Sequence, residues 1–518
     1  MTRCRLLVLA ALVAALALRL VALGHSSFWA DEAFTLLVGR LSFGDIWRHS
    51  ILNDFNPPLI YLLYRLWIPL IGRLSIEVGA RLLPVLMDVV AIWVAARVLH
   101  ERIGCDAAAI TAWLMAISPL EIEAARTARG YSLMLLLTLL CLHYADKFFA
   151  ENTKPPGPEK SHPLIGKSAS YLTISGSALV LALYTHYYGF FLLPAILALS
   201  LFHRKPSLTA YYLLPAAFFL PWTPAFLYHL RHGNAMIQPL SVRRLIRSGF
   251  ALFTGQTFFL NQPGLSILKI AILLVLAAFV LWAVIMYARW LRARGLPPHL
   301  ANLRSQLPFL FILAFFVPVE ALMVSLVVHG FEEFYFVMGL AGLFALVAVL
   351  WKVRASPSPL GGRGTGEGGI LRWGRWSGFA LASCLVVPMI AGILPIYGYE
   401  HQAWREGAEW VNERARGADI VLSNIRFDSY PVQFYYTGAA PLLDLTEESF
   451  DESELARASR GCGSVWLIGS YDPALPENRL RTWLNQHLTR LDQKVWRRVF
   501  VEQFRCASGS GPAARGAK

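Results

Sequence analysis

Three short stretches of the chain hold side chains of the types used in acid–base and phosphate chemistry. Asp31 and Glu32 are adjacent, and Asp54 follows in the same segment, which lies between two long apolar runs. Arg126 and Arg129 come later, at helical spacing. A carboxylate can take the proton from an attacking hydroxyl, and the planar guanidinium of arginine donates two hydrogen bonds to one phosphate. These residue types suit a reaction in which a hydroxyl attacks while a phosphate departs.

The composition places these residues in a membrane protein. Hydrophobic residues make up 56% of the 518 residues and charged residues only 15%, whereas soluble chains carry about a quarter. Apolar runs that suit membrane crossing recur through the first three quarters of the chain. They predict an all-α polytopic bundle of about eleven transmembrane helices. The expected spans are 6–24, 82–99, 107–120, 131–149, 169–184, 188–202, 208–228, 265–290, 307–328, 334–350 and 377–396.

Basic residues orient these spans. Under strict alternation, the links rich in Lys and Arg fall on one side, as the positive-inside rule expects of the cytoplasm. The net charge of +14 is therefore largely a topology signal, and no nucleic-acid partner is needed to explain it. The acids and Arg126, Arg129 and His186 then lie on the outer face.

The adjacent acids follow directly on the first expected span. Aromatic residues such as Phe28 and Trp29 belong at the level of the lipid headgroups, so Asp31 and Glu32 are expected at the outer interface. Carboxylates held there are costly to desolvate unless something pairs or uses them. The alternative is a solvated cap on a helix over residues 33–40.

Asp54 precedes an amphipathic stretch over residues 59–67. This stretch contains Tyr61, is short for a span, and suits a helix lying in the plane of the interface. Pro57 and Pro58 would end the preceding element and begin this helix. Asp54 could equally be a turn residue without a chemical role.

Arg126, Arg129 and His186 each have two interpretations. If residues 121–130 form a helical turn, both guanidinium groups lie on one side and can hold a departing phosphate. They could instead pair with nearby glutamates as a structural network. His186 lies in an outer turn, where it could face a reaction centre or simply be a hydrogen-bonding residue. A divalent cation could bind among Asp31, Glu32, Asp54 and His186, but spacing along the chain does not decide this.

The chain is expected to have three parts. Residues 1–398 form the transmembrane module, with outer loops at 25–80 and 229–264. Residues 399–506 form a small outer α/β domain, with helices over 400–416 and 477–491 and strands over 419–423, 432–436, 464–468 and 499–504. Within it, Cys462 and Cys506 could form a disulfide or remain free thiols. Residues 507–518 are expected to be a disordered tail, and residues 1–24 could be a cleaved signal peptide instead of a first span.

Taken in order, these motifs resemble the GT-C glycosyltransferases. Trp29 followed by Asp31-Glu32, then Asp54-x-x-Pro57-Pro58 and a Tyr-rich helix, is similar to the protein O-mannosyltransferase and lipid A aminoarabinose transferase group (family 39-like). The resemblance covers most of the chain, and departs from the family pattern at Asn56, where His is common, and at 333–335, where an Arg-Tyr pair is common. Further matching motifs are Arg81-Leu82-Leu83-Pro84, Ser118-Pro119 with Glu123, Arg126, Arg129 and Tyr131, Thr185-His186-Tyr187-Tyr188, Trp404-Arg405 and Phe434-Tyr435-Tyr436.

The resemblance implies a GT-C-like fold and transfer of a monosaccharide from a polyprenyl-phosphate donor to an acceptor hydroxyl, with inversion. The acceptor could be a lipid, a glycan or a protein, and the site would face the periplasm from a bacterial cytoplasmic membrane. Because the phosphate leaves as a stable anion without a proton, one carboxylate base is enough, unlike glycoside hydrolysis. Asp31 is the predicted general base, with Glu32 and Asp54 completing the catalytic set. The predicted substrate-binding residues are Asn56, Tyr61, Arg126, Arg129, Tyr131, His186 and Tyr187.

Other functions fit parts of this pattern. A lipid-linked oligosaccharide transporter or flippase would carry charged residues along a path through the bundle, often with repeated halves. A glycan polymerase or ligase would use related chemistry on preassembled glycan-lipids, and a sensor would use the tail as a binding module. A transferase is expected to gather Asp31, Asp54, Arg126, Arg129 and His186 in one outward-facing pocket.

Overall fold

The computed structural model describes residues 3–52, 56–153, 166–232, 241–260, 267–292, 298–328, 333–355, 375–423, 426–443, 452–459, 461–470 and 479–506. The chain divides into two compact units. The bundle unit consists of Met1–Leu23, Ser42–Leu63 and Arg81–Gly398. The α/β unit consists of Gly24–Leu41, Tyr64–Ala80 and Tyr399–Lys518.

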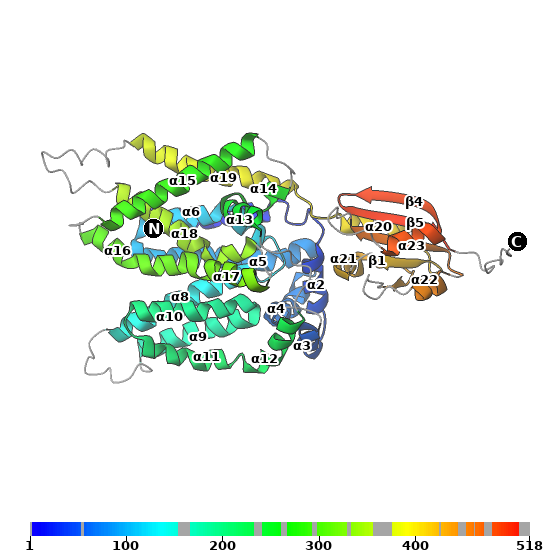
Figure 1. The fold of residues 1–518 in the computed structure, drawn as a ribbon, viewed down its shortest axis with the longest axis horizontal. Coiled ribbons are helices and arrows are strands. Elements are labelled where there is room, and N and C mark those ends of the chain that lie inside the picture. The colour runs from blue at the N-terminus through cyan, green and yellow to red at the C-terminus, as the bar shows by residue number, and fades with distance from the viewer. Residues whose placement is uncertain are drawn as a thin grey trace. The chain divides into compact units, whose positions relative to one another are not determined.

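The bundle unit is built from helices (Figure 1). A helix lies at each predicted span position, and the amphipathic helix begins and ends as predicted, at Leu59 and Trp67. The helices are α1 (Arg3–Leu20), α3 (Phe43–Leu52), α4 (Leu59–Trp67), α5 (Ile76–Ile103), α6 (Cys105–Ala116), α7 (Pro119–Ala125), α8 (Tyr131–Thr153), α9 (Lys167–Thr185), η2 (Tyr187–Phe191), α10 (Leu192–Phe202), η3 (Pro206–Tyr212), α11 (Leu213–Ala217), η4 (Leu220–Trp222), α12 (Thr223–Arg231), α13 (Val242–Thr254), α14 (Thr257–Leu260), α15 (Ile267–Arg292), α16 (Pro298–Phe311), η5 (Ile312–Phe316), α17 (Val317–Val328), η6 (Glu333–Phe336), α18 (Val337–Ala355) and α19 (Arg375–Gly398).

The described helices can be tested for whether they are long and apolar enough to cross a membrane. Among the described residues, five helices are long and apolar enough to cross a bilayer, or up to seven if each bent pair counts as one span. One bent pair joins α6 to α7 at an angle of 63°. The prediction of about eleven spans is therefore not confirmed, because several of the apolar runs form short or broken helices.

A buried ion pair connects the first helix to the bundle. The Nε atom of Arg19 donates to Asp88 Oδ2 on α5, and both side chains are fully buried. The remaining guanidinium nitrogens of Arg19 donate to the carbonyls of Ala15, Met115 and Ala116. Breaking such a pair is strongly destabilising because it leaves an uncompensated buried charge, so this contact ties α1 to α5 and α6.

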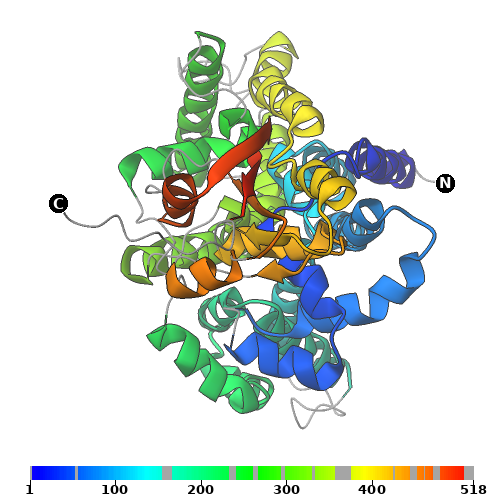
Figure 2. The ribbon, with the colours of Figure 1, turned by 90° about the vertical axis from the view of Figure 1, so that its right-hand side faces the viewer.

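The α/β unit contains a five-stranded sheet of order β2-β1-β3-β5-β4 in its described part (Figure 2). Its strands are β1 (Ile420–Ser423), β2 (Leu442–Leu443), β3 (Ser464–Ser470), β4 (Thr489–Trp496) and β5 (Val499–Arg505). Parallel pairs join β1 to β2 and β3, and antiparallel pairs join β5 to β3 and β4. Alternate side chains face opposite sides, so two cores form: one contains Leu467 and Phe500, the other Trp466 and Val501.

Helices complete both cores of the α/β unit. The first core takes side chains from α22 (Glu452–Ala458) and α23 (Arg479–His487), and the second from α20 (Trp404–Arg414) and α21 (Arg426–Tyr435). Helix α21 is where a strand over 432–436 was predicted, and that prediction is wrong. Its aromatic residues pack as a helical face against α2 (Ala30–Gly39), with the rings of Phe34 and Tyr430 4.8 Å apart. Strands β2 and β4 were not predicted.

The contacts of α2 also change the predicted domain boundaries. Phe28 donates its backbone N–H to the Tyr435 hydroxyl at 2.9 Å, and Arg405 pairs with Glu77 at 3.1 Å. Residues 24–41 and 64–80 therefore belong with the C-terminal residues, not with the bundle as the division at residue 398 implied. The predicted tail at 507–518 lies outside the described residues.

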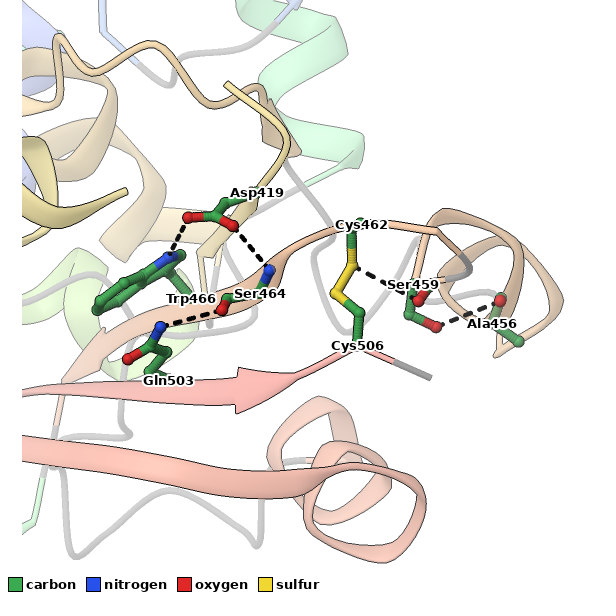
Figure 3. Close-up of a disulfide and its surroundings, with 8 residues drawn as sticks. All are labelled: Asp419, Ala456, Ser459, Cys462, Ser464, Trp466, Gln503 and Cys506. Carbon is green, nitrogen blue, oxygen red and sulfur yellow. Dashed lines mark hydrogen bonds between the residues drawn. A yellow bond between two sulfur atoms is a disulfide. The ribbon is translucent and has the colours of Figure 1, made fainter. Parts of the chain in front are cut away.

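Cys462 and Cys506 form a disulfide, which decides between the two alternatives left by the sequence (Figure 3). The bond ties the start of β3 to the end of β5 across 44 residues of sequence. Beside it, the Asp419 carboxylate accepts hydrogen bonds from the Ser464 backbone N–H at 2.7 Å and from Trp466 Nε1 at 3.1 Å (Figure 3). These contacts stabilise the edge where the two strands meet.

Candidate functional site

A pocket lies within the described part of the bundle unit, with about 430 Å³ of space when the open solvent at its mouth is included. Four separate segments of the chain supply its walls: the start of α4, the α7–α8 turn, the α9–η2 junction, and η6 with α18. Four of the predicted substrate-binding residues, Asn56, Arg129, Tyr131 and His186, line it. The other lining residues are Ile60, Gly130, Met134, Thr185, Tyr188, Phe334, Tyr335 and Met338.

The α7–α8 turn brings Arg129 to the pocket. Helix α7 begins behind Ser118, whose hydroxyl accepts the Glu121 N–H at 3.5 Å, and ends at Ala125. The chain then turns and enters α8 at Tyr131. Gly130 fits closely, because a Cβ atom there would lie 2.9 Å from Thr185 Cγ2. A residue with a side chain at this position would push the turn away from the α9–η2 junction.

Aromatic rings form much of the pocket wall. The rings of Tyr188 and Tyr335 meet edge to face at 4.0 Å, and His186 stacks on Tyr188 at 4.7 Å. The rings of Tyr131 and Phe334 also lie 4.8 Å apart. Such pairs add about 0.5–1.5 kcal/mol beyond area burial, so these rings hold one another in place. Among the described residues, the wall is therefore mostly apolar and includes one arginine, Arg129.

His186 lies between α9 and η2 with an extended backbone. Its Nδ1 accepts the Tyr188 backbone N–H at 3.2 Å, so in the neutral ring the proton is on Nε2. Burial lowers the pKa of His186 to about 3, and the charge of Arg129 acts in the same direction. The imidazole is therefore neutral at physiological pH, and can donate a hydrogen bond without adding positive charge to the pocket.

Arg126 does not line the pocket. Its guanidinium donates to the backbone carbonyls of Arg19, Val21 and Ala22, where α1 ends. The last carbonyls of a helix have no partner within the helix, and a cation there is favourable. Because α7 ends at Ala125, the helical spacing assumed for Arg126 and Arg129 does not apply. Arg126 therefore bonds the end of α1, whereas Arg129 lines the pocket.

The glutamates near these arginines have other partners. Glu123 accepts the backbone N–H groups of Gln256 and Thr257 at 2.7 and 2.8 Å, where α14 begins. Glu121 is fully buried and lies 3.9 Å from Arg19. The carboxylate of Glu123 therefore caps a helix start, where negative charge is favourable.

Tyr61 and Tyr187 are the remaining predicted substrate-binding residues. Tyr61 is fully buried in α4 and does not line the pocket. The Tyr187 hydroxyl forms hydrogen bonds with His229 Nδ1 at 2.5 Å and Trp222 Nε1 at 3.1 Å. Tyr187 therefore does not line the pocket, whereas its neighbours His186 and Tyr188 do.

Two of the predicted catalytic acids belong to the α/β unit, whereas the pocket-lining residues belong to the bundle unit. Asp31 and Glu32 lie in the first turn of α2, in the α/β unit, where negative charge suits a helix N-terminus. Glu32 is buried and Asp31 half-buried. The Asp31 backbone carbonyl accepts the Thr35 hydroxyl at 2.7 Å. Asp54 lies outside the described residues.

Sequence reasoning did not assign Gly130, Thr185, Tyr188, Phe334 or Tyr335 to a site. Two of these belong to the Thr185-His186-Tyr187-Tyr188 motif, and Gly130 adjoins Arg129, so the motifs contained a signal for them. Phe334 and Tyr335 stand where the chain departs from the family pattern. Within the part of the chain that the structure describes, no group of three or more His, Cys, Asp or Glu residues could hold a metal ion.

Comparison with known proteins gives the fold. No protein-family model matches the chain, and no curated protein matches it. Among solved structures, ArnT from Cupriavidus metallidurans bound to undecaprenyl phosphate is similar, with a TM-score of 0.57, 16% identity, and coverage of 96% of this chain and 97% of that one. The archaeal oligosaccharyltransferase AglB from Archaeoglobus fulgidus, in complex with an inhibitory peptide and a dolichol-phosphate, aligns with a TM-score of 0.53 at 14% identity, over 90% of this chain and 69% of that one. The GT-C-like fold expected from the motifs is confirmed.

Proposed function

We propose that the chain is an integral membrane glycosyltransferase that moves a monosaccharide from a polyprenyl-phosphate donor to an acceptor hydroxyl. The pocket in the bundle unit is the observation that carries this proposal. One arginine, one neutral histidine and four other aromatic rings line it. Arginine suits a phosphate, and aromatic faces suit the apolar face of a sugar or the first part of a lipid chain. The combination fits a sugar-phosphate headgroup better than it fits a free ion.

The structural neighbours support the same donor class. ArnT holds undecaprenyl phosphate and AglB a dolichol-phosphate. Both ligands combine an isoprenoid tail with a phosphate, which is the chemistry that the pocket of this chain offers. A lipid-borne donor is also accessible to a protein with several helices that suit a bilayer. We assign the reaction to the periplasmic face of a bacterial cytoplasmic membrane, as the distribution of basic residues favours.

Asp31 is the proposed general base, with inversion at the anomeric carbon. Its carboxylate would take the proton of the acceptor hydroxyl while that oxygen bonds to the anomeric carbon. The bond from that carbon to the phosphate oxygen breaks, and the lipid phosphate leaves as an anion. Glu32 and Asp54 are proposed to act beside Asp31.

Transfer assays in proteoliposomes test this proposal. Purified protein is supplied with a panel of radiolabelled polyprenyl-phosphate sugars and candidate lipid, glycan and peptide acceptors. General-base catalysis is worth about 10²–10⁴ in rate, so Asp31→Asn should lower kcat by that factor with little change in thermal stability.

Asp45→Asn is the matched control for this substitution. Asp45 is an exposed acid in the first turn of α3 that bonds only locally in the described contacts, to Ser42. Its amide should keep at least about half of wild-type activity, since exposed pairs of this kind contribute little. Equal activity of Asp31→Asn and wild type would remove the base assignment. Absence of transfer from every lipid-phosphate sugar by the wild-type protein would remove the proposed function.

A further inference from the structure

Tyr187, which lies in sequence between the pocket-lining His186 and Tyr188, belongs to a chain of hydrogen bonds, here called the relay, formed by Trp222, Tyr187 and His229. Trp222 Nε1 donates to the Tyr187 hydroxyl oxygen at 3.1 Å, and that hydroxyl meets His229 Nδ1 at 2.5 Å. His229 Nε2 contacts the backbone carbonyl of Ile51 at 2.9 Å. The relay joins η4, η2 and α12 to the last turn of α3, all within the bundle unit.

The chemistry of the partners gives the relay one direction. A carbonyl oxygen only accepts, so His229 must carry a proton on Nε2. In the neutral ring Nδ1 is then an acceptor, and it takes the proton offered by the Tyr187 hydroxyl. The hydroxyl oxygen in turn accepts from the indole N–H. The carbonyl of Ile51 is one of the last in α3 and lacks a partner in its own helix, so His229 also caps that helix.

Burial increases the free-energy cost of losing these hydrogen bonds. Trp222 is fully buried and His229 is 5% exposed. A buried polar group that loses its partner costs about 1–3 kcal/mol, so the protein should hold the three side chains in this one arrangement. The ring of Tyr187 also packs at 5.0 Å from Phe226 on α12. Tyr187 is thereby fixed by its ring and by its hydroxyl.

The pocket wall depends on Tyr187 because its neighbours in sequence line the cavity. His186 and Tyr188 both face the pocket, stack on each other, and share a bond from the Tyr188 N–H to His186 Nδ1. Gly189 then lets η2 lie against α9, since a Cβ there would be 2.6 Å from the Ala182 carbonyl carbon. A shift of the Tyr187 side chain would therefore rotate the backbone that carries both rings.

We propose that Tyr187 and His229 are positioning residues for the donor: acting through His186 and Tyr188, they hold the pocket wall in the geometry that the sugar-phosphate headgroup needs. This inference rests on the proposed function. Neither residue lines the pocket, so neither is expected to touch the substrate. Small misplacements of a binding wall can cost about 100-fold in rate, which gives such residues a measurable effect.

Steady-state kinetics of His229→Leu and His229→Gln in proteoliposomes test the inference. Leucine removes both hydrogen bonds of His229, whereas glutamine keeps one acceptor for the Tyr187 hydroxyl and one donor for the Ile51 carbonyl. His229→Leu should lower kcat/KM for the lipid-phosphate donor about tenfold or more, with the KM for the acceptor unchanged. His229→Gln should recover activity to within about threefold of wild type. The control is His232→Leu, an exposed residue just past the end of α12, which should behave as wild type.

Tyr187→Phe serves as the second variant if His229→Leu does not fold, because it removes only one hydroxyl. It should show the same donor-specific loss at a smaller size. Wild-type kinetics in both His229→Leu and Tyr187→Phe would overturn the inference while leaving the proposed function intact. So would an equal loss for donor and acceptor, or a His229→Gln protein that folds yet is no better than His229→Leu. If the wild-type protein transfers no sugar from a lipid phosphate, both the inference and the proposed function fail.

Discussion

Both units of the protein contain buried charged side chains with partners inside the fold, and the bundle unit also has half-buried polar side chains that line a pocket. In the α/β unit, the buried carboxylate of Glu502 is held by Arg481 and Arg490, each at 2.8 Å, and Asp419 is held by groups of the sheet. In the bundle unit, Asp88 is likewise held by Arg19, whereas the half-buried side chains of Arg129 and His186 line a pocket. Groups of the first kind stabilise a fold, whereas those of the second kind are placed where a ligand can reach them. The comparison supports the proposal that the donor headgroup binds in the bundle unit.

The largest effect is expected from replacing, one at a time, the two arginines that the sequence analysis grouped as a pair. Arg129→Ala should lower kcat/KM for the donor about 100- to 1,000-fold with little loss of stability, because a preorganised donor to the departing phosphate is lost. Arg126→Ala should instead lower the free energy of unfolding by about 1–3 kcal/mol, because the carbonyls at the end of α1 lose their partner. Kinetics and thermal unfolding of both variants measure this contrast. The same kinetic loss in both would contradict the separation.

The disulfide should matter for the α/β unit and not for the pocket. Cys462→Ser with Cys506→Ser should lower the stability of that unit by about 2–4 kcal/mol, because the bond closes a long loop in the unfolded chain. Binding of a lipid phosphate to the pocket should be unchanged at temperatures where the unit stays folded. Limited proteolysis reports on the unit, and a binding assay on the pocket. Loss of binding without unfolding would show that the two regions are not separable in this way.

A substitution of Gly130 tests how closely the α7–α8 turn packs against Thr185. Gly130→Ala should lower kcat/KM about tenfold, since the new methyl group would meet Thr185 Cγ2 at 2.9 Å and push Arg129 out of place. Adding Thr185→Ser removes the opposing methyl group and keeps the hydroxyl that bonds Leu181 at 2.7 Å. The double variant should recover most of the lost activity. If it is as slow as Gly130→Ala, the steric explanation is wrong.

The smallest effect concerns pH. Because the folded protein lowers the pKa of His186 to about 3, the unfolded chain binds more protons than the folded one between pH 3 and about 6.5. Stability should therefore fall as the pH drops through this window, with His186 contributing about 1 kcal/mol between pH 7 and 5.5. Thermal unfolding at both pH values should show a smaller drop in His186→Gln than in the wild type. An equal drop would mean that His186 titrates normally.

Most of the fold could be predicted from the sequence because hydrophobic periodicity and turn residues act locally. The apolar runs identified helices, and Leu59–Trp67 was predicted to the residue. The count of spans could not be predicted, since a run such as 107–120 does not reveal that the helix bends beside Pro119. The α21 error has a similar cause: Val432 and Phe434 have strand propensity, but packing against α2 selects a helix.

The candidate site was predictable in part for a different reason. Asn56, Arg129, Tyr131 and His186 stand in motifs whose order resembles a known family, and they line one pocket. The task of Arg126 could not be predicted, because it depends on the carbonyls of Arg19, Val21 and Ala22, which are far away in sequence. Sequence spacing cannot report such long-range partners.

The pocket of the bundle unit is proposed to bind the phosphate end of a lipid carrier. This claim is tested most directly by comparing the binding of undecaprenyl phosphate and undecaprenol to the purified protein, in the wild type and in Arg129→Ala. These two lipids share the same tail, so only the headgroup differs. The wild type should bind the phosphate at least about tenfold more tightly than the alcohol, and Arg129→Ala should lose most of that difference. Equal binding of both lipids by the wild type, or an unchanged preference in Arg129→Ala, would contradict the claim.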